Sequence, residues 1–272
     1  MNKFEKEYYE NKNFWKSEAF GDPDKNRIKE TVLFIPHDVE QLLDVGCGNG
    51  LFCNYLLTER NNLKITGLDR SETALKYLRT EKVLGDITHI PFGDGNFQCI
   101  TCLQVLEHLT IEDYKKAISE LTRVSSKYVI ISVPYKEKIE KNLTQCPQCK
   151  TIFNLDLHLR NFTKNDLTEL LLPHGFDCIS LKTFGIKKKL LGSQFFRKIV
   201  KLKINRGFNS PICPICGFKN EEFITNLARN VIPQRKNAKS FVMNAINLLW
   251  PKIKTNDYWI IALYRKSENL VS

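Results

Sequence analysis

The chain lacks the two features that would place it in or across a membrane. It has no run of about 18 unbroken apolar residues, the length that a membrane-spanning helix needs. The segment from Met1 to Tyr8 is charged and has no apolar stretch of the kind found in secretory leaders. We therefore expect a cytoplasmic protein, whose nine cysteines are buried thiols or metal ligands rather than disulfides.

Acidic residues are scarce in the last third of the chain. Residues 182–272 carry 18 Lys and Arg against 4 Asp and Glu, whereas residues 1–181 carry 23 against 26. Within residues 187–203, apolar side chains can share one helical face beside basic ones: Leu191, Phe195, Ile199 and Leu202. Such a helix suits an anionic membrane surface, which would make the protein peripheral there. It also suits nucleic acid, or a substrate-covering lid whose lysines are only solvated.

The most informative segment is residues 42–51, Leu-Leu-Asp-Val-Gly-Cys-Gly-Asn-Gly-Leu. An apolar run ends at Asp44 and opens into alternating glycines, which can take positive φ angles and let a ligand approach the backbone. Leu51 to Glu59 then has helical spacing. A glycine turn between a strand and a helix is a cofactor site in many α/β proteins. Leu51 stands where a dinucleotide fingerprint needs its third glycine, so a dinucleotide is not predicted.

An acidic residue followed by G-x-G-x-G resembles the first motif of class I S-adenosylmethionine-dependent methyltransferases. Residues 63–69 resemble the second strand of that family, which ends in a carboxylate, and Gly85-Asp86-Ile87 resembles its third-strand exit. Residues 96–109 resemble its fourth strand and the V-L-E-H-L run of the small-molecule, "type 11" branch. The resemblance covers residues 30–185 and the last strand. One departure is Gln98, where the family usually has Asp at a structural position.

The resemblance implies a Rossmann-like, doubly wound α/β fold with a mostly parallel seven-stranded sheet and an antiparallel last strand. It implies that Asp44 serves the amino-acid end of S-adenosylmethionine, Asp69 the ribose hydroxyls and Asp86 the adenine amino group. The implied cofactor-binding residues are Asp44, Gly46, Cys47, Gly48, Gly50, Asp69, Arg70, Asp86, Ile87, Leu103 and Gln104.

Hydrophobic periodicity predicts the elements of this fold. Strands are expected near 41–45, 63–68, 82–85, 97–103, 127–133, 176–183 and 258–264, and helices near 50–59, 72–79, 111–123 and 164–173. Thr163 is the predicted N-cap of the last helix, with Asp166 three residues on. Residues 1–30 are assigned to an aromatic-rich helical cap, which either covers the cofactor or packs on the sheet edge. The methyltransferase core is assigned to 31–184 and 255–272, with insertions at 137–162 and at 185–254, the second basic and helical.

Two C-P-x-C pairs lie in the predicted insertions, at Cys146 and Cys149 and at Cys213 and Cys216. Each pair resembles a zinc knuckle, and two knuckles make a tetrahedral four-sulfur site. The 63 residues between Cys149 and Cys213 include a predicted helix and a predicted strand, which allows both insertions to emerge on one side of the sheet. The alternative is two unrelated thiol pairs. The other thiols are read as small buried hydrophobes: Cys47, Cys53, Cys99, Cys102 and Cys178.

Two histidines are the candidates for acid–base chemistry. His158 lies in a segment that resembles the H-L-R-x-F run lining the substrate mouth of some family members, and it is preferred to His108 as general base or substrate ligand. His158 could instead stand beside the metal or cap a helix.

The predicted function is methyl transfer from S-adenosylmethionine to oxygen or nitrogen of a small-molecule, glycan-pathway or lipid-pathway acceptor. The alternative is a zinc-containing, basic nucleic-acid-binding protein or RNA methyltransferase. Leu103-Gln104-Val105-Leu106 replaces the N/D-P-P-Y/F motif of base-amino methyltransferases, which favours the first. The sequence does not specify an oligomeric state.

Overall fold

The computed structural model describes residues 7, 9–10, 15, 22–154, 156–185, 188–190, 213–218, 252–254 and 257–268. The chain divides into two compact units. The larger unit comprises Tyr9–Ile139, His158–Gly185 and Tyr258–Ser272, and the smaller comprises Met1–Tyr8, Glu140–Leu157 and Ile186–Asp257.

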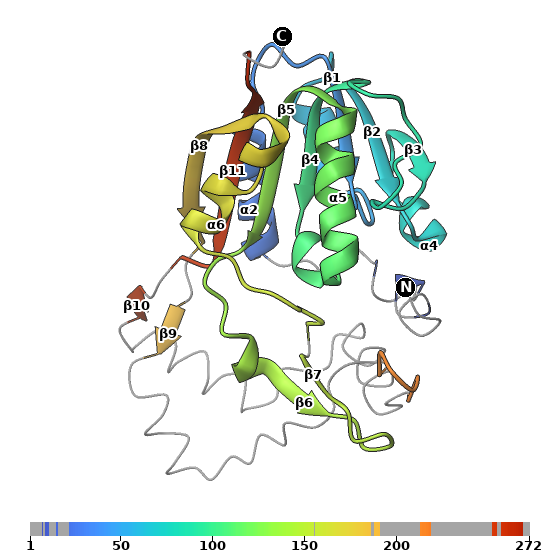
Figure 1. The fold of residues 1–272 in the computed structure, drawn as a ribbon, viewed down its shortest axis with the longest axis vertical. Coiled ribbons are helices and arrows are strands. Elements are labelled where there is room, and N and C mark those ends of the chain that lie inside the picture. The colour runs from blue at the N-terminus through green and yellow to red at the C-terminus, as the bar shows by residue number, and fades with distance from the viewer. Residues whose placement is uncertain are drawn as a thin grey trace, which may run out of the picture. The chain divides into compact units, whose positions relative to one another are not determined.

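A seven-stranded sheet with the order β3-β2-β1-β4-β5-β11-β8 forms the centre of the larger unit (Figure 1). Strand β11 runs antiparallel to both β5 and β8, and all other neighbours in this sheet are parallel. This confirms the predicted doubly wound α/β sheet with an antiparallel last strand. The strands are β1 (Gln41–Val45), β2 (Lys64–Asp69), β3 (Glu81–Leu84), β4 (Phe97–Leu103), β5 (Ser125–Pro134), β8 (Phe176–Phe184) and β11 (Trp259–Lys266).

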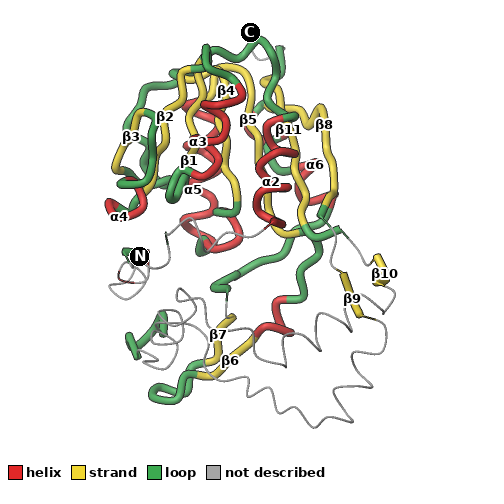
Figure 2. Tube along the Cα trace, turned by 180° about the vertical axis from the view of Figure 1, so that it is seen from behind, coloured by secondary structure: helices red, strands yellow, loops and turns green. Residues whose placement is uncertain are grey.

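Helices cover both faces of this sheet. Helices α5 (Ile111–Val124) and α6 (Lys164–Glu169) lie on the face seen in Figure 1, and α2 (Asp22–Val32) and α3 (Leu51–Glu59) lie on the opposite face seen in Figure 2. Each layer has its own buried apolar cluster, one including Leu121 and Leu167 and the other including Ile28 and Phe52. Since both faces are covered, the central strands are almost entirely apolar.

Helix α6 begins as predicted and ends earlier. The Thr163 side chain accepts a hydrogen bond from the Asp166 N–H, and the Asp166 carboxylate accepts one from the Thr163 N–H. This capping box fixes the first turn. The helix ends at Glu169 and is followed by a 3-10 turn, Leu172–His174, whereas one helix over 164–173 was expected. Pro173 has no N–H to donate to an α-helical bond, which accounts for the change.

The predicted helix over 72–79 is reduced to α4 (Glu72–Leu75). The side chain of Asn54 in α3 donates to the carbonyl of Tyr77 and accepts from the N–H of Arg79. These bonds take up backbone groups that a longer helix would use, and the chain turns instead. A 3-10 turn also follows β4 (Leu106–His108).

Gln98, the departure from the family pattern, has a structural role. Its side-chain oxygen accepts hydrogen bonds from the N–H groups of Glu40 (2.6 Å) and Gln41 (3.2 Å). It therefore joins the start of β4 to the start of β1, which is a task that an Asp carboxylate could also perform.

The described part of the smaller unit contains two short antiparallel ribbons and a 3-10 turn, Ile139–Asn142, that begins at its edge. Strand β6 (Leu143–Gln145) pairs with β7 (Ile152–Asn154), and β9 (Lys188–Leu190) pairs with β10 (Lys252–Lys254). Residues 188–190, which precede the expected basic helical face, are thus a strand. The residues of that face, Leu191, Phe195, Ile199 and Leu202, lie outside the described part of the chain.

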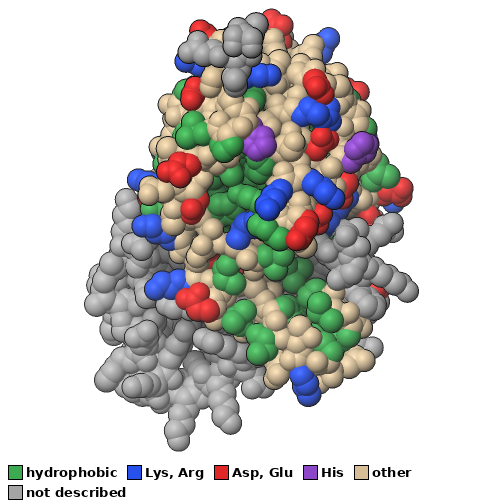
Figure 3. Space-filling view, in the orientation of Figure 1, with side chains coloured by type: hydrophobic (Ala, Val, Ile, Leu, Met, Phe, Trp, Pro, Cys, Tyr) green, Lys and Arg blue, Asp and Glu red, His purple; other side chains and the backbone are tan. Residues whose placement is uncertain are grey.

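Among the described residues, no helix combines the length and the apolar character needed to cross a membrane. On the α5–α6 side of the larger unit, acidic and basic side chains are interspersed around a group of hydrophobic ones (Figure 3).

Candidate functional site

The glycine turn joins β1 to α3 at the carboxyl end of the sheet. Gly46, Gly48 and Gly50 all have positive φ angles, of 77°, 53° and 72°. The N–H groups of Gly46 and Cys47 both donate to the carbonyl of Leu68, at 2.8 and 3.0 Å, which ties the turn to the end of β2. These bonds fix the backbone of the turn at the carboxyl end of the sheet.

Substitution of Gly46 tests how tightly this turn is packed. A Cβ at Gly46 would lie 2.4 Å from Cγ2 of Val105, a β-branched side chain that cannot easily move. We expect Gly46→Ala to lower the free energy of unfolding by about 1–3 kcal/mol more than Gly95→Ala in urea titrations. Gly95 is the matched control, with φ of 62° and 3.6 Å of room to Ser126. Equal losses in the two variants would show that the turn tolerates a side chain.

Asp69, at the end of β2, is the centre of the predicted cofactor site. Its carboxylate accepts hydrogen bonds from the N–H of Gly48 (2.8 Å) and from the N–H of Ser71 (2.9 Å). Burial raises the pKa of Asp69, and these two backbone donors oppose that rise. An ionised carboxylate has about four acceptor sites, so two remain for a ligand after the backbone bonds are made.

Asp44, in β1, is bound by side chains of β4 and α3. Its two oxygens interact with the Thr101 hydroxyl, at 2.7 Å, and with the Cys53 thiol, at 3.3 Å. Only 2% of the residue is exposed. Burial raises the pKa of Asp44 to about 6, against the opposing bonds from Thr101 and Cys53. Because so little of the Asp44 carboxylate is exposed, we expect it to interact with a ligand mainly through a bridging water molecule.

The raised pKa of Asp44 makes stability depend on pH. Between pH 3.8, the ordinary pKa of an Asp, and about pH 6, Asp44 keeps its proton in the folded protein but has lost it in the unfolded chain. The free energy of unfolding therefore falls as the pH rises through this range. Asp44→Asn removes this titration. Without cofactor, the variant's free energy of unfolding relative to wild type should rise by up to about 3 kcal/mol between pH 4 and pH 7. A difference that stays constant across this range, measured by urea titration, would contradict the assigned environment.

The other predicted cofactor residues lie along the same edge. The Asp86 carboxylate accepts from the N–H (2.9 Å) and hydroxyl (2.7 Å) of Thr88, which shapes the exit from β3. Gln104, after β4, has a φ of 59°, and a strained non-glycine backbone of this kind concentrates at functional sites. Ile87 is buried and Leu103 is half-buried. The Cys47 side chain packs into the apolar cluster under α3.

Aromatic residues of the N-terminal segment cover this edge. Trp15 lies against Gly48, and its carbonyl accepts from the Asn49 side chain at 2.9 Å. The Tyr9 ring stacks near Trp15 and lies 4.5 Å from the guanidinium of Arg70. Trp15 therefore lies at the glycine turn, and Tyr9 lies beside it.

A second group of ionisable side chains lies past the end of β4. Glu107 and His108 are in the 3-10 turn, and the His158 ring packs edge-on against His108 at 4.8 Å between centroids. Nδ1 of His158 hydrogen-bonds to the carboxylate of Glu137, which follows β5. Burial raises the pKa of Glu107 to about 7. The structure thus brings the two predicted catalytic histidines together and adds two glutamates.

Residues 158–162 are held between the ends of β4 and β5. The Leu159 N–H donates to the Glu107 carbonyl (2.8 Å), and the Lys136 N–H donates to the Phe162 carbonyl (2.9 Å). The Arg160 guanidinium lies 4.1 Å from the ring centre of Tyr114. Alternate residues point inward, and His158 and Phe162 are buried while Leu159 is 59% exposed. The backbone therefore fixes His158 beside the sheet edge.

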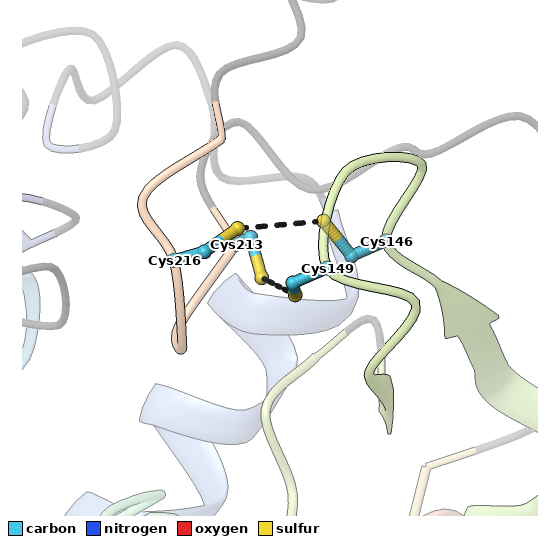
Figure 4. A group of neighbouring side chains, drawn as sticks. All are labelled: Cys146, Cys149, Cys213 and Cys216. Atoms are coloured by element: carbon cyan, nitrogen blue, oxygen red, sulfur yellow. Dashed lines mark hydrogen bonds between the residues drawn. The ribbon is translucent and has the colours of Figure 1, made fainter.

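The four cysteines of the C-P-x-C pairs lie within reach of one another in the smaller unit (Figure 4). The sulfur atoms of Cys146 and Cys216 are 3.7 Å apart, and those of Cys149 and Cys213 are 3.8 Å apart. Sulfurs bound tetrahedrally to one zinc ion at about 2.3 Å stand about 3.8 Å from each other. The spacing fits a four-sulfur zinc site and is too long for a disulfide.

The two cysteine turns have the same backbone pattern. In each, the N–H of the first cysteine donates to the carbonyl five residues later, in Thr151 and in Phe218, at 2.9 Å. The residue after the second cysteine, Lys150 or Gly217, has positive φ and donates to the first cysteine's carbonyl at 3.0 Å. Two like turns that face each other present four sulfurs to one point.

Two residues of these sites have no local signal in the sequence. Ser71 reaches the Asp69 carboxylate only through the tertiary fold, and no motif marks it. Glu137 follows β5 without a pattern of its own. Glu107 was visible in the V-L-E-H-L run, where adjacent acidic and histidine residues after a strand could have indicated ligands.

The larger unit contains the region that matches a known family. Residues 43–131 match the family described as "Methyltransferase domain". A probable S-adenosylmethionine-dependent methyltransferase of Mycobacterium tuberculosis is 27% identical over 142 residues, covering 50% of this chain and 48% of that protein. A tRNA U34 carboxymethyltransferase of Nautilia profundicola is 29% identical over 137 residues, covering 42% and 45%.

An uncharacterized protein of Methanocaldococcus jannaschii is 34% identical over 107 residues, covering 38% of this chain and 44% of that protein. The chain thus spans less than half the length of these curated relatives. Over part of its length, the chain is thus similar to S-adenosylmethionine-dependent methyltransferases.

Solved structures share the fold at low identity. A SAM-dependent methyltransferase from Archaeoglobus fulgidus has a TM-score of 0.53 and 14% identity, covering 90% of this chain and 95% of its own. The [4+2]-cyclase SpnF has a TM-score of 0.50 and 17% identity, covering 89% and 81%. Because one fold serves both a methyltransferase and a cyclase, the fold alone does not fix the reaction.

Proposed function

We propose that this protein is an S-adenosylmethionine-dependent methyltransferase whose cofactor lies at the carboxyl edge of the larger unit's sheet. The observation that carries the proposal is the Asp69 carboxylate, held by the N–H groups of Gly48 and Ser71 beside a turn of left-handed glycines. The strands β1 and β3 flank β2, and Asp44 lies near the end of β1 while Asp86 follows β3, so three carboxylates lie at neighbouring strand ends.

These residues fit the parts of the donor. Asp69 has acceptor sites left for two ribose hydroxyls, as the sequence predicted. Asp44 is assigned to the positively charged amino-acid end and Asp86 to the adenine amino group, as the family resemblance implies. Ile87 and Leu103 give apolar walls, and Gln104 stands where the methyl group would face its acceptor.

Methyl transfer is an in-line displacement that depends mainly on the alignment of acceptor and methyl carbon. His158 is oriented by its bond to Glu137 and lies with His108 next to the β4 end, which suits a substrate ligand or general base. The proposed acceptor is oxygen or nitrogen of a small-molecule, glycan-pathway or lipid-pathway compound.

Titration calorimetry of the purified protein with S-adenosylmethionine and S-adenosylhomocysteine tests this function. Binding of both, with no binding of NAD, is the expected result. A mass-spectrometric screen of extracts for products that have gained one methylene unit would then identify the acceptor. If the protein binds neither S-adenosylmethionine nor S-adenosylhomocysteine, the proposal is refuted.

A second candidate, an RNA methyltransferase, is favoured by one relative and by the charge of the last third. The Nautilia profundicola relative acts on tRNA by its name, and residues 182–272 are strongly basic. Filter binding with a salt titration separates the candidates. Tight RNA binding with a steep salt slope would favour the second. Contact of the basic segment with an anionic membrane surface, and a cytoplasmic location, stay predictions.

We also propose a structural zinc ion at Cys146, Cys149, Cys213 and Cys216. The two sulfur–sulfur distances near 3.8 Å and the repeated backbone pattern support it. The ion would join two segments that are distant in sequence, and thereby close the smaller unit.

A further inference from the structure

Three ligand-type side chains converge past the end of β4 in the larger unit. Glu107 and His108 come from the 3-10 turn, and His158 comes from the returning segment. One ligand atom of each lies within 4.8 Å of the others. Two atoms that each bind one ion at about 2.1 Å are at most about 4.2 Å apart. Small side-chain rotations are therefore enough to place all three on one ion.

Glu107 is the exception among the buried carboxylates of this unit. It is 0% exposed, and neither carboxylate oxygen has a hydrogen-bond partner in the part of the chain that the structure describes. Asp44 and Asp69, by contrast, each have two donors. A buried carboxylate without donors is costly, and a bound cation would offset that cost. Its backbone cannot swing away, since Leu159 holds its carbonyl.

His158 has the supporting contact that metal-binding histidines usually have. Its Nδ1 is hydrogen-bonded to the Glu137 carboxylate, so it would meet an ion through Nε2. A carboxylate behind the imidazole fixes the ring and makes it a stronger ligand. The Glu137 side chain is only 9% exposed, so this pair is shielded from water.

We propose that Glu107, His108 and His158 bind a divalent transition-metal ion, oriented by Glu137, and that this ion holds a hydroxyl group of the methyl acceptor. Two imidazoles and one carboxylate are a ligand set that such ions favour, and three protein ligands leave coordination positions open. Val105, two residues before Glu107, packs on Gly46, so the ion would lie close to the cofactor turn.

The acceptor part of this proposal rests on the proposed methyltransferase function. A hydroxyl bound to the ion loses its proton more readily, and the proton leaves to solvent. The oxygen then forms a bond to the methyl carbon while the carbon–sulfur bond breaks and its electron pair stays on sulfur. This selects an oxygen acceptor over a nitrogen one.

Electron paramagnetic resonance with Mn²⁺ tests the site in the full chain, purified with the cysteine site loaded with zinc. Wild type should remove one equivalent of Mn²⁺ from the free-ion signal. Glu107→Gln, an isosteric change, and His158→Ala should each weaken binding at least tenfold. His174→Ala, which alters an exposed histidine, and Cys213→Ser/Cys216→Ser should bind Mn²⁺ as wild type does.

Two further readouts separate the possible failures. S-adenosylmethionine calorimetry on the same variants reports folding and the cofactor site, and should be unchanged by Glu107→Gln. Enhanced relaxation of water protons by bound Mn²⁺ would show open positions for an acceptor. Absence of Mn²⁺ binding in wild type, or equal binding in all variants, overturns the metal site. Bound Mn²⁺ without relaxation enhancement overturns the hydroxyl role.

Discussion

The double variant Cys213→Ser/Cys216→Ser is expected to lose the zinc that wild type retains through gel filtration. Zinc–thiolate binding in small domains contributes roughly 10–16 kcal/mol at neutral pH, so removal of half the ligands leaves no stable site. Element analysis by mass spectrometry measures this directly. Cys178→Ser is the matched control, because Cys178 is a half-buried thiol in β8 outside the group.

Loss of zinc should act on the smaller unit and spare the larger one. The described part of the smaller unit has only three-residue strands and one small cluster around the cysteines. Limited proteolysis should therefore cut residues 140–157 and 186–257 rapidly in the double variant. S-adenosylmethionine binding by the larger unit should persist. Wild-type protein without zinc, or a double variant that retains it, would contradict the proposed site.

The second large effect is expected at Asp69. Asp69→Ala should weaken S-adenosylmethionine binding by more than about 100-fold, because two charge-assisted hydrogen bonds to the ribose contribute about 1.5–3 kcal/mol each. The substitution also removes the acceptor of the Gly48 and Ser71 N–H groups, so some loss of thermal stability should accompany it.

Asp69→Asn distinguishes these two effects. It keeps one acceptor oxygen for the backbone and loses the negative charge, so we expect smaller loss of stability with most of the loss of affinity. Asp94→Asn is the control, since that side chain is 83% exposed and pairs only with Arg123 among the ion pairs that the structure describes. Calorimetry with S-adenosylmethionine measures the affinity, and thermal melts measure the stability, of all three variants. An unchanged affinity for Asp69→Ala would refute the ribose role.

The local sequence pattern was enough to predict most strands of the seven-stranded sheet. Parallel strands buried on both faces must be apolar runs, and glycine turns and caps must stand at their ends, so β1, β2 and β4 could be read with small errors. The capping box at Thr163 is likewise a local feature. The helix over 72–79 failed because its end depends on Asn54, a side chain that a different helix provides.

The cofactor edge was predictable because carboxyl ends of parallel strands meet at one edge, whatever the details of packing. The sequence by itself therefore determined the fold class, the glycine turn and the three carboxylates Asp44, Asp69 and Asp86. Tertiary structure alone decided that Glu107 is buried without donors beside His108 and His158, and that two cysteine pairs 63 residues apart face each other. Such groupings join segments distant in sequence, and only the folded chain brings their side chains to one point.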